Sequence, residues 1–130
     1  MKLTVVVYSA PYSSQAAWSA YQFTRAALTA GHEIYRLFFY ADGVHNTNSL
    51  SIPPQDEFDL VKAWQSLIAE HHIDAISCVS SALKRGVVDV QEAARYERTC
   101  NNLISDVTLS GLGQLVDATL VSDRVVSFGA

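Results

Sequence analysis

The chain has 130 residues, of which 49% are hydrophobic and 17% charged, and its formal net charge is −4 at pH 7. This length suits one domain that buries a core without disulfides, and a composition this apolar excludes an intrinsically disordered chain. The acidic balance argues against direct nucleic-acid binding, because phosphate contacts require a dense basic surface. We therefore expect a single domain over residues 1–130.

The first predicted element is an apolar run, Leu3–Tyr8, which ends at once in Ser, Ala and Pro. The run is too short for the core of a signal peptide and far too short to span a bilayer. We therefore interpret it as the first strand of a cytoplasmic protein with no membrane segment. The two cysteines, Cys78 and Cys100, do not form a disulfide framework, and a reducing compartment would keep both as thiols.

Apolar runs then alternate with segments that carry helix-capping residues. Ser13 and Ser14 can cap the first helix, Asp56 the second, and Asp89 can begin a capping box further along. The predicted strands are residues 3–8, 34–40, 73–79, 107–109 and 124–128. The predicted helices are residues 13–30, 56–72, 79–86, 89–99 and 110–122.

Strands that alternate with helices through short connections indicate βαβ units. We therefore predict an α/β fold: a single-domain, doubly wound, five-stranded parallel sheet with helices on both faces. The common flavodoxin-like strand order, 2-1-3-4-5, would place the switch point between the first and third strands. In that order the "SAPYS" turn after the first strand would face the end of the third strand across a crevice.

Cys78 lies at the carboxyl end of the third predicted strand, within "ISCVSSALKRGV", and is the candidate catalytic residue. A short helix after it would direct free N–H groups and its dipole at the sulfur, which lowers a thiol pKa from about 8.5. Lys84 and Arg85 follow and would add positive potential that stabilises the thiolate. The alternative is that Cys78 fills space as a small hydrophobe, and its position alone does not separate the two. Cys100 ends a helical segment with no strand before it, and we predict that it has a packing role.

No other pattern predicts a metal or cofactor site. His71 and His72 are adjacent, so on a helix their side chains diverge by about 100° and make a poor metal pair. The "GLG" stretch lacks the third glycine of a dinucleotide fingerprint, which favours a tight turn, and no serine sits in a G-x-S-x-G elbow. The polar loop of residues 41–55 follows a strand, so it is either a solvated loop or a border of the site.

Seven stretches of the sequence resemble, in the same order, motifs of the DsrE/TusD family of sulfur-transfer proteins. They are "SAYQF", "GHEI", "FFYADGV", "DEFDLVKAW", "CVSSALKRGVVD", "LSGLGQLVDA" and "DRVVSFG", and they extend along nearly the whole chain. In the cysteine block, the strongest of the seven, Cys78 matches the persulfide-carrying cysteine of the family. The resemblance therefore implies a DsrE-like fold in which Cys78 is the nucleophile of a sulfurtransferase that needs no cofactor.

The family contains two branches that the motifs do not separate; we expect the TusD-like branch and tRNA thiolation, with the DsrE-like branch as the alternative. A TusD-like subunit accepts persulfide sulfur from a TusA-like donor and passes it to a TusE-like acceptor, for 2-thiouridine synthesis at the tRNA wobble position. It works in a heterohexamer with TusB-like and TusC-like paralogues. A DsrE-like subunit works with DsrF-like and DsrH-like paralogues in dissimilatory sulfur oxidation and hands sulfur to a DsrC-like acceptor. Two alternatives remain: a non-catalytic scaffold subunit, and a flavodoxin-like cofactor binder, which the lack of a phosphate loop after the first strand disfavours.

The first predicted helix carries more aromatic residues than one buried face accommodates. Trp18 and Tyr21 accompany an Ala/Phe stripe, and at about 100° per residue these side chains cannot all point inward. Large aromatics outside a core stripe are typical of interfaces. The two residues either contact other subunits or pack under neighbouring loops. We expect the first, in a complex with the paralogous subunits that presents Cys78 at an open crevice.

Overall fold

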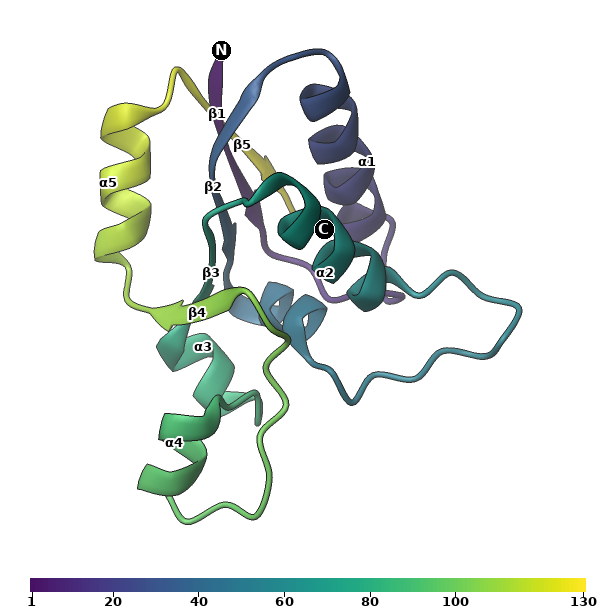
Figure 1. Cartoon of the computed structure of the whole chain (residues 1–130), viewed down its shortest axis with the longest axis vertical. Helices are drawn as coiled ribbons and strands as arrows, with labels where there is room; N and C mark the ends of the chain where they lie inside the picture. Colours follow the sequence, from purple (N-terminus) through teal and green to yellow (C-terminus); the bar gives the residue numbers. More distant parts are fainter.

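The computed structural model describes residues 1–130 and contains one sheet of five parallel strands, as Figure 1 shows. The strands are β1 (Lys2–Val7), β2 (Glu33–Phe39), β3 (Ala75–Cys78), β4 (Val107–Ser110) and β5 (Arg124–Phe128). The helices are α1 (Ala16–Thr29), α2 (Leu60–His71), α3 (Val79–Lys84), α4 (Val90–Arg95), α5 (Gly113–Val121) and a 3₁₀ helix, η1 (Ala41–Thr47). The predicted α/β class with a five-stranded parallel sheet is confirmed.

The strand order is β4-β3-β2-β1-β5, so the predicted flavodoxin-like order is wrong. β2 pairs with both β1 and β3 and occupies the centre of the sheet. It suits this place because its apolar residues fill both faces: Leu37 and Phe39 on one, Phe38 on the other. The order of the strands reverses at β1, which lies between β2 and β5. The turn after β1 is therefore separated from the end of β3 by a whole strand.

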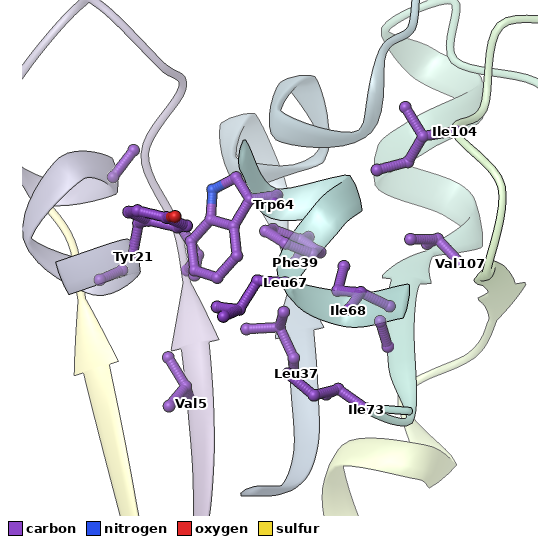
Figure 2. Close-up of a cluster of buried hydrophobic side chains, with 14 of the residues drawn as sticks. Val5, Tyr21, Leu37, Phe39, Trp64, Leu67, Ile68, Ile73, Ile104 and Val107 are labelled. Carbon is purple, nitrogen blue, oxygen red and sulfur yellow. The ribbon is translucent and has the colours of Figure 1, made fainter. Parts of the chain in front are cut away.

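The two faces of the sheet are covered unequally. α1 and α2 lie over one face, α5 alone lies over the other, and α3 and α4 lie beyond the carboxyl ends of the strands (Figure 1). The larger core, of 22 buried residues, lies under α1 and α2, and Figure 2 shows Trp64 and Phe39 at its centre. The opposite face holds a small cluster of four buried residues, namely Val6, Phe38, Ile76 and Cys78.

Two of the three predicted helix caps are wrong. α1 has Gln15 at its cap position and no side-chain cap there, so neither Ser13 nor Ser14 is its N-cap, although the Ser14 hydroxyl accepts a hydrogen bond of 3.3 Å from the Ala16 N–H. α2 is capped by Asp59, whose carboxylate accepts a hydrogen bond of 3.1 Å from the Lys62 N–H, and not by Asp56 as predicted. Asp56 lies instead in the turn that precedes the helix. Asp89 accepts a hydrogen bond of 2.8 Å from the Glu92 N–H, which confirms the predicted cap of α4.

The first half of the polar loop is folded into the protein as η1. Asn46 is fully buried; its amide donates to the Ser9 carbonyl at 2.9 Å, and its carbonyl accepts from Trp64 Nε1 at 3.2 Å. Gly43 packs against the end of β1 so closely that a Cβ atom would lie 1.9 Å from the Val7 carbonyl oxygen. These contacts fix η1 against the carboxyl end of the sheet, so this part of the loop is not a solvated segment.

Tyr21 and Trp18 do not both lie outside the core as expected. Tyr21 is buried, and its ring meets that of Trp64 edge-on with centroids 5.3 Å apart. Trp18 is 36% exposed and packs against Tyr21 and Phe58. Of the two aromatic side chains, only Trp18 reaches the surface.

Candidate active site

Cys78 is the last residue of β3, and α3 begins at the next residue. Its side chain points to the face that α5 covers, where it packs with Phe38 and Ile76 under the half-buried side chains of Tyr40 and Leu115. Cys78 is only 1% exposed, so the expected open crevice is not present. The thiol therefore lies at the carboxyl end of the third strand, as predicted, but the side chains of Tyr40 and Leu115 cover it.

Two serines surround the sulfur with hydrogen-bonding groups. The Ser80 hydroxyl oxygen lies 3.6 Å from the Cys78 sulfur. Burial raises the pKa of the Cys78 thiol, but hydrogen bonds from the hydroxyl and N–H groups of Ser81 and Ser80 outweigh it, so that the pKa lies below its ordinary value. Because the thiolate is the nucleophile, this setting favours reaction near neutral pH.

Ser81, which helps to lower the pKa of the Cys78 thiol, is also hydrogen-bonded to the loop that follows β2. Ser81 is buried, and its hydroxyl oxygen accepts a hydrogen bond of 3.1 Å from the N–H of Ala41, the first residue of η1. The first residues of the 41–55 loop therefore border the candidate site, which answers the question that the sequence left open. Neither serine was predicted as a site residue, although both directly follow the cysteine in the sequence and are hydrogen-bonding residues.

Lys84 and Arg85, predicted to stabilise the thiolate, have other neighbours. The Arg85 Nε donates to the Asp42 carboxylate at 2.8 Å, and its terminal nitrogen donates to the Ser81 carbonyl at 3.2 Å. Lys84 lines a separate cavity of about 540 Å³. Neither positive charge is among the causes of the lowered Cys78 pKa.

Cys100 does not have the packing role that the sequence suggested. It is exposed, in the segment after α4, and lines the same cavity as Lys84 together with Tyr96 and Arg98. The two cysteines thus occupy opposite settings: Cys78 is buried beside the sheet, and Cys100 is open to solvent.

No group of three or more histidine, cysteine or acidic side chains is placed to hold a metal ion. None of the helices combines the length and the apolar character that crossing a membrane requires.

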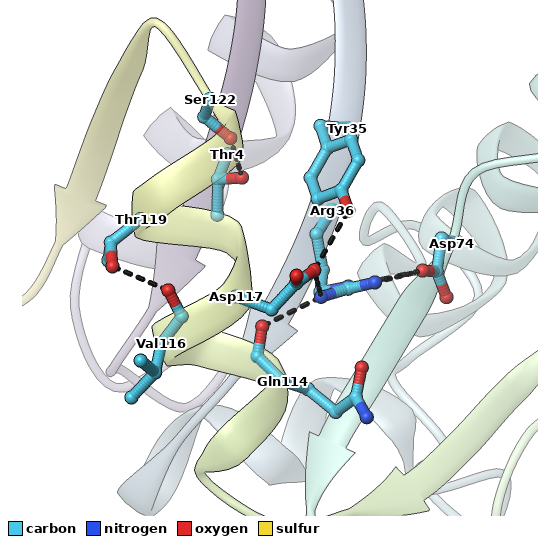
Figure 3. Close-up of polar contacts among 9 residues, drawn as sticks. All are labelled: Thr4, Tyr35, Arg36, Asp74, Gln114, Val116, Asp117, Thr119 and Ser122. Carbon is cyan, nitrogen blue, oxygen red and sulfur yellow. Dashed lines mark hydrogen bonds and ion pairs between the residues drawn. The ribbon is translucent and has the colours of Figure 1, made fainter.

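A polar clamp fastens α5 to the face of the sheet on which Cys78 lies (Figure 3). The buried guanidinium of Arg36 donates to Asp74 on one side at 2.8 Å and to Asp117 of α5 on the other at 2.9 Å. It also donates to the Gln114 carbonyl at 2.7 Å, and the Tyr35 hydroxyl donates to Asp117 at 2.8 Å. Hydrogen bonds from Tyr35 and Arg36 lower the pKa of the Asp117 carboxyl.

Fold and site together define the class: a parallel α/β domain with one buried, serine-bonded thiol at the carboxyl end of its sheet. The chain belongs to the DsrE/DsrF-like family, whose sequence profile matches residues 1–128. This finding confirms the resemblance read from the motifs.

Two individual proteins illustrate the relationship. The chain is 46% identical over 129 residues to "Putative sulfurtransferase DsrE" of Allochromatium vinosum, an alignment that covers 99% of both proteins. The crystal structure of the YchN protein from E. coli matches with a TM-score of 0.79 and 19% identity, over 98% of this chain and 99% of that one. At that identity the structural match shows that the two proteins share a fold.

Proposed function

We propose that this chain is a sulfurtransferase subunit that carries sulfur as a persulfide on Cys78. The observation that carries the proposal is the thiol of Cys78, which ends the inner strand β3 and has a pKa lowered by the hydrogen bonds of two serines. The 46% identical relative, named as a sulfurtransferase, supports the same reaction class.

The proposed reaction is an exchange at sulfur in two steps. The Cys78 thiolate attacks the outer sulfur of a donor persulfide, R–S–SH; a new S–S bond forms, the donor S–S bond breaks, and R–S⁻ leaves. In the second step an acceptor thiolate attacks the outer sulfur on Cys78, and the Cys78 thiolate leaves in turn. Each step conserves charge and needs no oxidant, metal or organic cofactor.

The partners in the proposal follow the two branches of the family. The donor is a TusA-like protein, and the acceptor is TusE-like or DsrC-like. The subunit works in the cytoplasm within a heterohexamer, with TusB-like and TusC-like or with DsrF-like and DsrH-like paralogues. The tRNA-thiolation route was our expectation from the sequence; the name of the 46% identical relative favours a DsrE-type subunit as the second candidate.

Intact mass after incubation with a persulfide donor tests the carrier role. We expect wild type and Cys100→Ser to gain one sulfur atom each, and Cys78→Ser to gain none. No gain on wild type would contradict the proposal and favour the scaffold alternative. A gain that survives in Cys78→Ser and disappears in Cys100→Ser would move the carrier to Cys100.

Presenting the persulfidated chain to the two kinds of acceptor separates the branches. Sulfur that moves to a TusE-like protein supports the tRNA route, and sulfur that moves only to a DsrC-like protein supports the oxidation route.

A further inference from the structure

A second cavity opens where the end of α3 meets the segment that follows α4. Its volume is about 540 Å³, which lies within the range of small-molecule sites. Lys84 lines it from α3, and Tyr96, Arg98 and Cys100 line it from the segment after α4. The cavity shares no lining residue with the cluster around Cys78, so the proposed sulfur transfer leaves it unused.

The hydrogen bonds of Asn102, which is buried and also lines the cavity, fix its shape. The Asn102 amide donates to the Gly86 carbonyl at 2.9 Å and to the Asn48 side-chain oxygen at 3.0 Å. Its own side-chain oxygen accepts from the Val88 N–H at 2.8 Å. These bonds join the loop after η1, the residues after α3 and the segment that carries Cys100. Because Cys100 precedes this anchor by two positions, the cavity exists before any ligand arrives.

The lining of this cavity is positively charged, although the protein is acidic. The formal net charge of the chain is −4, yet the lining contains Lys84 and Arg98 and no aspartate or glutamate. Neither cation forms an ion pair with a carboxylate of the chain, and the Arg98 guanidinium donates to the Tyr96 carbonyl at 3.0 Å. A cleft lined by charges of one sign concentrates ions of the opposite sign, so this cavity suits an anion.

Cys100 adds a nucleophile to the same cationic wall. Its thiol is free and exposed, in contrast to the buried thiol of Cys78. An accessible thiol exchanges with disulfides, and the positive charges beside it favour disulfides whose substituents are anionic. The cavity therefore combines an anion site with a group that can form a reversible covalent bond to sulfur.

We propose that this cavity binds a small disulfide that carries carboxylate groups, and that Cys100 is the thiol that this disulfide modifies. The Cys100 thiolate attacks one sulfur of R–S–S–R; a Cys100–S–S–R bond forms, the original S–S bond breaks, and R–S⁻ leaves. The step conserves charge, and the disulfide itself is the oxidant. The carboxylates of the retained R group face Lys84 and Arg98, and a reducing thiol reverses the modification. This site is additional to the sulfur carrier at Cys78 and does not depend on it.

Two disulfides of different charge test the cavity in a Cys78→Ser background, where Cys100 is the sole thiol. Glutathione disulfide is the anionic probe, and the disulfide of mercaptoethanol is the neutral one. Intact mass followed over time gives the rate of mixed-disulfide formation with each probe. The ratio of the two rates, anionic over neutral, removes the intrinsic reactivity of the thiol from the comparison.

The combined Lys84→Gln and Arg98→Gln variant should lower this ratio by about tenfold, the lower end of what a charged cleft adds to an association rate. Added salt should reduce the difference, because it screens exposed charges. Arg95→Gln is the matched control: it removes an exposed cation of α4 that does not line the cavity, and it should leave the ratio nearly unchanged. All three side chains are exposed, so these variants keep the fold.

Three results would overturn the inference. An unchanged ratio in the combined variant would show that the cavity does not select anions. An equal fall with Arg95→Gln would assign the selection to general surface charge. No mixed disulfide with either probe would exclude Cys100 as the modified thiol. Sulfur uptake by Cys78 is measured in the separate Cys100→Ser chain, so the proposed function and this inference can fail independently.

Discussion

The sulfur of Cys78 experiences two opposed influences, and the balance between them decides its reactivity. Its apolar surroundings disfavour the charged thiolate, while the serine hydroxyls and N–H groups favour it more strongly. The serines were not predicted as site residues, although they follow the cysteine directly in the sequence. The sequence could not show that Arg85 turns toward Asp42, since side-chain direction depends on where η1 packs.

The lowered pKa of Cys78 predicts a pH-dependent contribution to stability. A group whose pKa is lower in the folded than in the unfolded chain stabilises the fold fully above the unfolded value, about 8.5 for cysteine. This contribution is lost as the pH falls through the folded pKa. In a Cys100→Ser background, we therefore expect the stability advantage of the Cys78 chain over its Cys78→Ser variant to grow as the pH rises toward that unfolded value. Urea unfolding across pH measures it, and an advantage that shrinks with rising pH would contradict the lowered pKa.

Among the elements, α5 supplies part of the cover over the thiol. Leu115 of this helix packs on the Cys78 cluster, whereas Val116, one residue further, is 58% exposed. The glycines at positions 111 and 113, just before and at the start of α5, have open space around their Cα atoms. Because Cys78 is only 1% exposed, a reagent reaches its sulfur only when the side chains that cover it move.

Leu115→Ala should therefore speed the alkylation of Cys78 by about tenfold, which corresponds to ~1.4 kcal/mol. This free energy is smaller than the ~2–5 kcal/mol of stability that truncating a fully buried leucine to alanine removes. The difference is expected because Leu115 is only partly buried. Timed alkylation with peptide mapping gives the rate, and Val116→Ala is the matched control. Equal rates for the two variants would show that Leu115 does not limit access.

The hydrogen bonds of Arg36 hold α5 on the sheet. Their loss should lower the stability of the fold and increase the accessibility of Cys78. Arg36→Gln should lower the free energy of unfolding by about 1–2 kcal/mol, since it removes charged hydrogen bonds whose carboxylate partners remain half exposed. Urea denaturation measures the loss, with the exposed Arg25→Gln as control. A loss no larger than that of the control would contradict the clamp.

Acid should loosen the same clamp. The folded pKa of Asp117 lies below its ordinary value, so its stabilising contribution is present above about pH 4 and is lost as the pH falls through the folded pKa. Hydrogen exchange of α5, compared with that of α2 at each pH, should show α5 opening first on acidification. Asp117→Asn should remove this difference in pH response, and a persistent difference would assign it to another group.

At the scale of the whole molecule, local patterns predicted the elements but not their arrangement. Capping residues, glycines and apolar runs lie near in sequence, so strands and helices were found to within a few residues. The order of the strands depends on which apolar runs meet. β1, β2 and β3 have apolar sequences of similar character. The sequence of one strand therefore does not predict that β2 lies between the other two. The misplaced switch point and the missed cover of Cys78 both follow from this ambiguity.

The outer surface of α5 carries exposed apolar side chains that no other part of the chain covers. Leu112, Val116 and Leu120 lie four residues apart along one line, and Leu120 is 80% exposed. Contiguous apolar side chains of this kind mark interaction surfaces in soluble proteins. The stripe lies on the helix that covers Cys78, so a partner bound there would act directly on access to the sulfur.

We therefore predict that the paralogous subunits bind this stripe, and that Leu120→Lys weakens the complex by about tenfold or more, as expected for a leucine buried in an interface centre. Its stability as a separate chain should change little, because the side chain is already in water. The matched control is Val90→Lys, an equally drastic change at an exposed position of α4. Co-expression with the paralogues followed by light scattering measures assembly. A Leu120→Lys chain that assembles like wild type would show that the stripe is not the interface, and a wild-type chain that stays monomeric with both paralogues at micromolar concentration would contradict the assembly itself.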